Sequence, residues 1–160
     1  MDEIKTLTFE QYHIIAHNIT DLVWTLLDKP ELTPDDSDRL VSAAYAARFH
    51  HGEFGDPLDV ARAEWHLARV NLKVQRPIPA LYHGQKCLEI CRDSELEPFT
   101  IAYAYEALAR AAAFIGDTDA TEEYLRLGRQ FGKMIEKEEE KNMFFADLST
   151  VPGYKEMLGD

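Results

Sequence analysis

The sequence predicts an all-α fold made of three stacked antiparallel helix pairs and a C-terminal capping helix. A shift of the chain by forty residues places Trp65 on Tyr105 and Cys87 on Leu127, in two apolar blocks separated by a turn. A period of about 20–50 residues with two helical blocks in each unit is typical of a helical repeat. Apolar residues recur at helical spacing along most of the chain, and proline and glycine signals divide it into segments.

The first helix pair is expected between residues 8 and 51. Helix one covers residues 8–28, ends at Lys29-Pro30, and carries one apolar stripe of Tyr12, Ile15, Ile19, Leu22 and Leu26. Helix two starts at Thr33-Pro34, where a capping hydroxyl precedes a proline in the first turn. It runs to about His51, and residues 52–55 are expected to form a loop.

The second pair begins with the same kind of signal at Asp56-Pro57. Its first helix carries the stripe Ala61, Trp65, Ala68 and Leu72. The run Pro77-Ile78-Pro79 opens its second helix, which carries Leu81, Gly84, Leu88 and Cys91 on one side. We expect Trp65 to be a packing residue and not a ligand contact, because it stands on this stripe.

The third pair begins at Glu97-Pro98. Its first helix carries Ile101, Tyr105, Leu108, Ala112 and Ile115, and its second carries Ala120, Tyr124, Leu127, Phe131 and Met134. Gly116-Asp117 joins the two as a tight turn, with a glycine stop and an aspartate cap. The charged run 136–141 is expected to be a solvated segment. Met143, Phe144 and Leu148 predict a short last helix that caps the stack.

Length and charge limit the classes of function. The 160 residues fit a single domain over 1–160. The net charge of −12 disfavours nucleic acid as a partner and favours a protein or peptide, with a basic peptide matching the charge. No apolar run is long enough to span a membrane. The start, MDEIKTLTFEQYH, does not resemble a signal peptide, and Cys87 and Cys91 are poorly spaced for a disulfide. These features predict a cytoplasmic protein with reduced thiols.

The third to sixth predicted helices, which form the second and third pairs, resemble the tetratricopeptide repeat (TPR) family. Trp65, Ala68 and Leu72 match the first helix of one unit, and the next unit is matched by Tyr105, Leu108, Ala112, Gly116-Asp117, Ala120, Tyr124 and Leu127. The unit is forty residues long instead of the usual 34 or so. Residues 40–117, with stretches such as ARAEWHLARV and AYAYEALARAAAFIGD, are most similar to a group of short TPR-like proteins. The resemblance implies a stack with a concave peptide-binding groove and leaves the activity open.

The candidate groove lies on the first helices of the second and third pairs. Tyr103, Glu106 and Arg110 share a face that differs from the core stripe of their helix. In TPR proteins this face lines the groove, and the matching face of the preceding unit carries His66, with Arg69 beside it. The same residues also fit a structural ion-pair network between stacked helices. Arg69 is expected to be close enough in register to pair with Glu106.

Other polar patterns are weaker. His13 and His17 have a spacing that can present two imidazoles to one metal, but no third ligand is identifiable. The stripe of His83, Cys87 and Cys91 is too long to share one ion, and its thiols are expected to be buried and inert. The sequence has no Gly-rich phosphate loop, HExxH, GxSxG or CxxC motif. We therefore expect no metal or cofactor.

Three functions fit these features. The first is a non-enzymatic protein- or peptide-binding module that uses His66, Arg69, Tyr103, Glu106, Arg110 and His50 in a concave polar groove. The second is a small-molecule or catalytic site, in which His50 and Glu106 act as acid and base and Arg69 holds an anion. The third is a homodimer formed through the apolar last helix, with an empty groove.

Overall fold

The structure, a computed structural model, describes residues 7–159 and contains eight α-helices and no strand within that range. In chain order the helices are α1 (Phe9–Leu27), α2 (Pro34–Phe54), α3 (Pro57–Lys73), α4 (Pro77–Asp93), α5 (Pro98–Ile115), α6 (Thr118–Lys133), α7 (Glu138–Leu148) and α8 (Tyr154–Leu158). The all-α prediction is confirmed. The expectations about a leader sequence and about the first residues of the domain fall on residues 1–6, which lie outside the described range.

The helices begin at the predicted signals. Thr8, Thr33 and Asp56 are N-caps whose side chains accept a hydrogen bond from the backbone N–H three residues later, each within a capping box. Gly116 ends α5 in the left-handed conformation, at a φ of 77°, which costs glycine no steric strain. The Asp117 side chain then accepts from the Ala120 N–H at the start of α6.

One predicted boundary is wrong. The expected loop at residues 52–55 is reduced to Gly55, because α2 continues to Phe54. The Phe54 ring stacks on Tyr12 of α1 with centroids 4.0 Å apart, which stabilises this extra turn. The charged run 136–141 is solvated as expected, with residues 136–139 exposed, and α7 begins within it at Glu138. Three glutamates occupy its first turn, where the positive end of the helix dipole favours acids.

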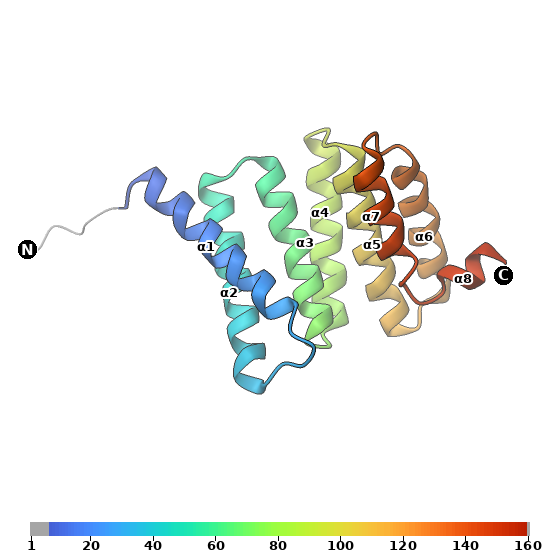
Figure 1. Cartoon of the computed structure of the whole chain (residues 1–160), viewed down its shortest axis with the longest axis horizontal. Coiled ribbons are helices and arrows are strands. Elements are labelled where there is room, and N and C mark those ends of the chain that lie inside the picture. The colour runs from blue at the N-terminus through green and yellow to red at the C-terminus, as the bar shows by residue number, and fades with distance from the viewer. Residues whose placement is uncertain (1–6, 160) are drawn as a thin grey trace, which may run out of the picture.

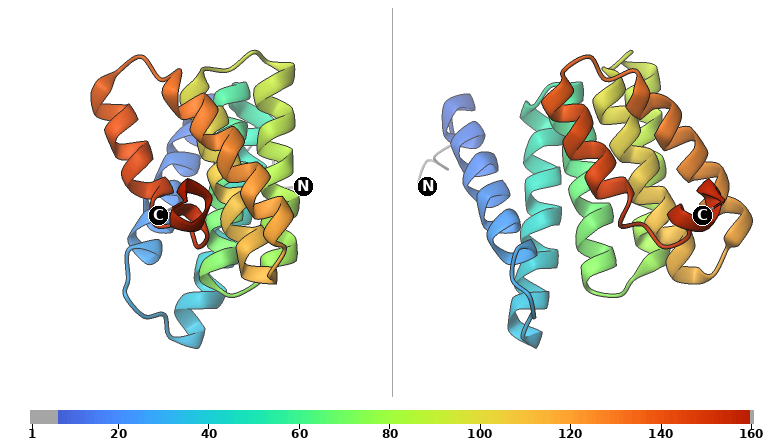
Figure 2. Two further views of the ribbon diagram at one scale, coloured as in Figure 1. Left: turned by 90° about the vertical axis from the view of Figure 1, so that its right-hand side faces the viewer. Right: turned by 45° about the vertical axis from the view of Figure 1, so that its right-hand side comes forward.

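Successive helices run in alternating directions, and each of the first six packs against the next (Figure 1). A second set of contacts links every other helix: α3 touches both α1 and α5, and α5 touches α7. The helices α1, α3, α5 and α7 therefore form one row. Helix α7 lies alongside α5 and α6, and the short α8 packs on α6 (Figure 2). This row of helices positions the candidate site.

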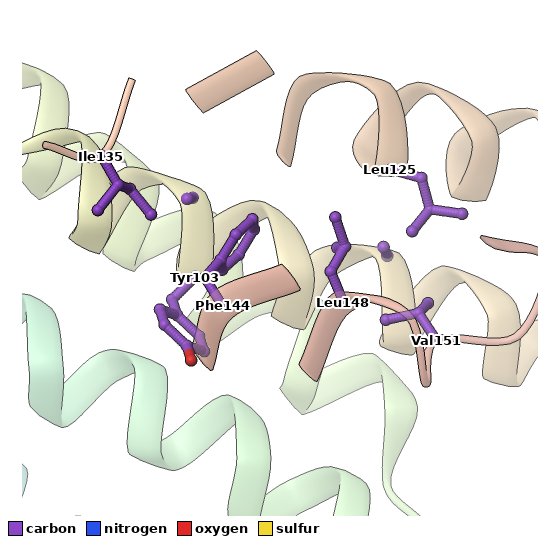
Figure 3. Packing of buried hydrophobic residues seen from close by; sticks show 8 residues of the cluster. Tyr103, Leu125, Ile135, Phe144, Leu148 and Val151 are labelled. Carbon is purple, nitrogen blue, oxygen red and sulfur yellow. The ribbon is translucent and has the colours of Figure 1, made fainter. Parts of the chain in front are cut away.

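The core consists of three clusters along the stack. The cluster at the N-terminal end joins α1, α2 and α3 through Val23, Leu26, Leu40, Leu67 and Val70. The middle cluster joins α3 to α6 and includes both cysteines. The cluster at the C-terminal end is shown in Figure 3, where Phe144 and Leu148 of α7 lie against Tyr103 of α5 and Leu125 of α6. Helix α7 therefore packs on the apolar surface formed by α5 and α6.

The cysteines are buried and free, as expected. The hydrogen bond with Cys91 and burial raise the pKa of the Cys87 thiol well above its usual value. None of the helices in residues 7–159 combines the length and the apolar character that a membrane span requires.

Candidate binding site

A cavity of about 670 Å³ lies along the row formed by α1, α3, α5 and α7. Helix α3 contributes the largest share of its wall, and α2 adds one residue from its last turns. The lining residues are His17, Thr20, Trp24, His51, Asp59, Arg62, Ala63, Trp65, His66, Arg69, Phe99, Thr100, Tyr103, Met143 and Asp147. Most of this wall is apolar or aromatic, and the charged groups are two arginines and two aspartates.

The spacing of α3 explains why it forms the floor of the cavity. Arg62, His66 and Arg69 stand three and four residues apart, so they share one face of the helix. Ala63 is small and leaves room for the cavity beside them. The capping box at Asp56 and the proline at position 57 fix the start of this helix, and thereby the register of all these side chains.

A chain of aromatic rings crosses the cavity wall from α1 to α5. The Trp24 ring lies 5.7 Å from the Trp65 ring and 4.8 Å from the His66 ring, measured between centroids. Trp65 in turn lies 5.5 Å from Tyr103, which lies 5.0 Å from Phe99. These tilted and edge-to-face arrangements are the favoured ones for aromatic pairs, and they hold the wall in one shape.

Trp65 packs in the core and also lines the cavity. It packs against the middle and C-terminal core clusters, as expected for a packing residue. Its ring is also part of the cavity wall. That Trp65 makes no ligand contact therefore stays a prediction. Its indole N–H is buried and has no hydrogen-bond partner.

His66 is held in its neutral form. Burial lowers its pKa to about 4, and the nearby charges of His51, Arg62 and Arg69 add to this effect. At neutral pH the ring therefore offers one donor and one acceptor nitrogen to the cavity without bringing a charge. A few such polar groups in an apolar wall are what fixes the orientation of a ligand.

Two of the predicted groove residues lie behind the cavity and not in it. Glu106 is 0% exposed and is held by Arg110, one turn further along α5, and by Arg69 Nη1 at 3.4 Å. Arg110 also donates to the Asp147 carbonyl oxygen at 2.8 Å and to the Thr150 hydroxyl at 2.5 Å. The predicted Arg69–Glu106 pair is confirmed, and Glu106 and Arg110 form a structural network that ties α5 to α3 and to the end of α7.

Glu106 and Arg110 lie outside the cavity because other helices surround α5. Helices α3, α4, α6 and α7 all pack against it, so both its core stripe and its expected groove face are covered. Tyr103 is the exception because it stands at the edge of this covered region. Its hydroxyl donates to the Asp147 carboxylate at 2.7 Å, and burial together with this bond raises its pKa.

Of the two adjacent histidines, His51 lines the cavity and the predicted His50 does not. His50 does not line the cavity; its ring lies against Tyr12 and Phe49, with centroids 5.6 Å away in both cases. His51 lines the cavity instead, with Nε2 3.3 Å from the Thr20 hydroxyl. Burial lowers the pKa of His51. A helix turns by about 100° per residue, so adjacent histidines face different directions.

The candidate site thus contains His66, Arg69 and Tyr103 from the prediction. Sequence reasoning missed the residues from helices outside the aligned repeat, of which Trp24 and Met143 are the largest. Trp24 had a usable signal, because it stands about one repeat length before Trp65. Met143 had none, because its place depends on how α7 packs.

Within residues 7–159 no group of three or more histidine, cysteine, aspartate or glutamate side chains is placed to hold a metal ion. The Nε2 atoms of His13 and His17 are 3.0 Å apart, which is a two-ligand pair on an exposed helix face. No family model, no curated protein and no solved structure matches this chain.

Proposed function

We propose that this chain is a TPR-like stack that binds a segment of a partner protein in the cavity and catalyses no reaction. One observation carries the proposal. The cavity wall is a row of aromatic side chains contributed by consecutive first helices, with a neutral histidine and arginines among them. Such a wall suits an extended segment that inserts apolar or aromatic side chains and uses its backbone for hydrogen bonds.

The charges of the cavity support a segment without strong charge at the point of contact. Arg62 and Arg69 are balanced by Asp59 and Asp147. Outside the cavity the chain is strongly acidic, with a net charge of −12. Basic residues that flank the bound segment would speed its association through long-range attraction, whereas the cavity itself would select the apolar side chains.

The proposed acid–base pair of His50 and Glu106 has no support. Neither residue lines the cavity, and Glu106 is already committed to two arginines. Binding of a small molecule is the second candidate, because a volume of about 670 Å³ falls within the usual range for ligand pockets.

Affinity capture with matched variants tests the proposal. Trp24 is 39% exposed in the cavity wall, and Phe49, which is 61% exposed, does not line the cavity. Phe49→Ala should lose little packing, whereas Trp24→Ala also removes the ring contacts with Trp65 and His66, so circular dichroism first checks that both variants are folded. We expect Trp24→Ala to lose the partner that the parent chain captures from an extract of its own cells, and Phe49→Ala to retain it. Capture that is equal in both variants would contradict the proposal.

Native mass spectrometry separates the two candidates. The parent chain, incubated with the small-molecule fraction of the same extract, is expected to show only its own mass. A bound species that is present with the parent and Phe49→Ala but absent with Trp24→Ala would favour the small-molecule function instead.

A further inference from the structure

A second polar cluster, away from the cavity, connects α2, α3 and α4. The Tyr45 hydroxyl lies 2.9 Å from Nε2 of His83, and Nδ1 of the same ring lies 2.7 Å from an oxygen of Glu64. Arg48 donates to the other Glu64 oxygen at 2.6 Å. None of these residues lines the cavity, so the proposed binding function does not use them.

The proton positions in this cluster follow from the acceptors. Burial raises the pKa of Glu64, but the hydrogen bonds from His83 and Arg48 outweigh it, and the pKa is lowered overall. An ionised carboxylate can only accept, so Nδ1 of His83 carries the proton and donates it. In the neutral ring Nε2 then has a free electron pair that faces the hydroxyl of Tyr45.

This is the arrangement that activates a nucleophile: a hydroxyl, a base within hydrogen-bond distance, and a carboxylate that orients the base. Glu64 and His83 are buried, whereas Tyr45 is 41% exposed. The base and its orienting group are therefore fixed by packing, and the tyrosine that carries the hydroxyl lies at the surface of the protein.

We propose that Tyr45 is a base-activated nucleophile that accepts an acyl group from an activated acyl donor. The tyrosine oxygen forms a bond to the carbonyl carbon of the donor, and its proton passes to Nε2 of His83. The bond between that carbon and the leaving group breaks, and the leaving group takes the proton from His83. The products are an acylated Tyr45 and the protonated leaving group. Glu64 acts as a positioning residue for His83.

The chain contains a matched internal control. Tyr82 is 59% exposed, which is more than Tyr45, and its hydroxyl has no hydrogen-bond partner in the part of the chain that the structure describes. The Lys86 ammonium lies over its ring, 5.9 Å from the centroid. Its greater exposure would make Tyr82 the faster of the two, so the comparison is biased against the proposal.

The experiment treats the full chain with N-acetylimidazole and follows acetylation of each tyrosine by mass spectrometry of its peptides. We expect Tyr45 to react at least about tenfold faster than Tyr82, a threshold set below the roughly 10²–10⁴-fold that a positioned base contributes. Equal rates, or a faster Tyr82, would overturn the proposal on the parent chain alone, before any variant is made.

Two variants locate the cause. His83→Gln keeps a group that can donate to Glu64 but removes the base, and should bring the Tyr45 rate down to that of Tyr82 without changing Tyr82. Glu64→Gln should lower the Tyr45 rate while far-ultraviolet circular dichroism shows an intact fold. A folded His83→Gln in which Tyr45 keeps its full advantage would overturn the assignment of His83 as the base. If a variant fails to fold, the rate ratio in the parent chain decides.

Discussion

The cavity wall and the polar network directly behind it share helices α3, α5 and α7 but differ in role: the wall faces the cavity, and the network connects the helices. Trp24 and His66 line the cavity. Glu106 and Arg110 are turned into the protein, where Arg110 donates to Glu106, to the Asp147 carbonyl oxygen and to the Thr150 hydroxyl. Within the described residues the second carboxylate oxygen of Glu106, Oε2, is buried without a hydrogen-bond partner. The polar residues that look most like a site in the sequence are the structural ones, and the groups left free for a ligand are mostly aromatic.

This comparison predicts a separation of effects. Changes in the network should alter the free energy of unfolding and spare binding, whereas changes in the wall should alter binding and spare stability. A buried carboxylate between two arginines is costly to disturb, because its removal leaves positive charge without a partner. Removal of an exposed aromatic side chain from a cavity wall leaves no charge without a partner and costs less stability.

The largest effect is expected for Glu106→Gln, which removes the charge that both arginines share. The variant should lose about 3 kcal/mol of unfolding free energy, a value at the lower end for broken buried pairs because Arg69 and Arg110 keep partial access to water. Urea denaturation measures this loss. Glu89→Gln removes an exposed carboxylate paired with Lys86 and should change stability by less than about 0.5 kcal/mol. Equal losses in the two variants would break the comparison.

The packing of α7 is tested at a glycine of α6. A Cβ at Gly132 would collide with the Phe144 ring, which is fully buried in the C-terminal core cluster. Gly132→Ala should therefore cost about 2 kcal/mol in a thermal or urea melt. Gly128 is the control on the same helix, because a Cβ there would meet Tyr105 at an ordinary distance of 3.4 Å. Gly128→Ala should be neutral or slightly stabilising, and the opposite order would show that α7 is not packed as described.

The neutral state of His66 predicts a dependence of stability on pH. Its pKa is about 4 in the folded chain, against about 6.5 for an unperturbed histidine, so the unfolded chain takes up the proton first as the pH falls. The free energy of unfolding should fall between pH 6.5 and 4, and it should not depend on this group above about pH 7.5. Between pH 7.5 and 5 the parent chain should lose up to about 2 kcal/mol more than His66→Phe. Parallel losses in the two chains would mean that His66 is as easily protonated as a free histidine.

The smallest effect is expected at the boundary between wall and network. Tyr103→Phe removes the hydroxyl that donates to Asp147 but keeps the ring against Trp65 and Phe144. The variant should lose about 1 kcal/mol of unfolding free energy and retain the captured partner. Loss of the partner at unchanged stability would mean that this hydroxyl belongs to the binding surface and not to the network.

Local signals in the sequence were sufficient for the helices but not for the site. Caps at Thr8, Thr33 and Asp56 and the stop at Gly116 act within a few residues, so they could be read directly. Whether a helix face is open depends on what packs over it. The face of Tyr103 and Glu106 was expected to be an open groove, and α7 covers part of it. No periodicity in α5 carries that information.

The most direct test of the binding account uses the fact that the chain has two tryptophans, Trp24 and Trp65, and that both line the cavity. A ¹⁵N-labelled sample gives one indole N–H signal for each. In a titration with the segment of the captured partner, we predict that both signals shift and saturate together with binding, while the backbone signals of α4 stay in place. Saturating binding that leaves both indole signals unmoved would show that the partner uses another surface, and would contradict the account.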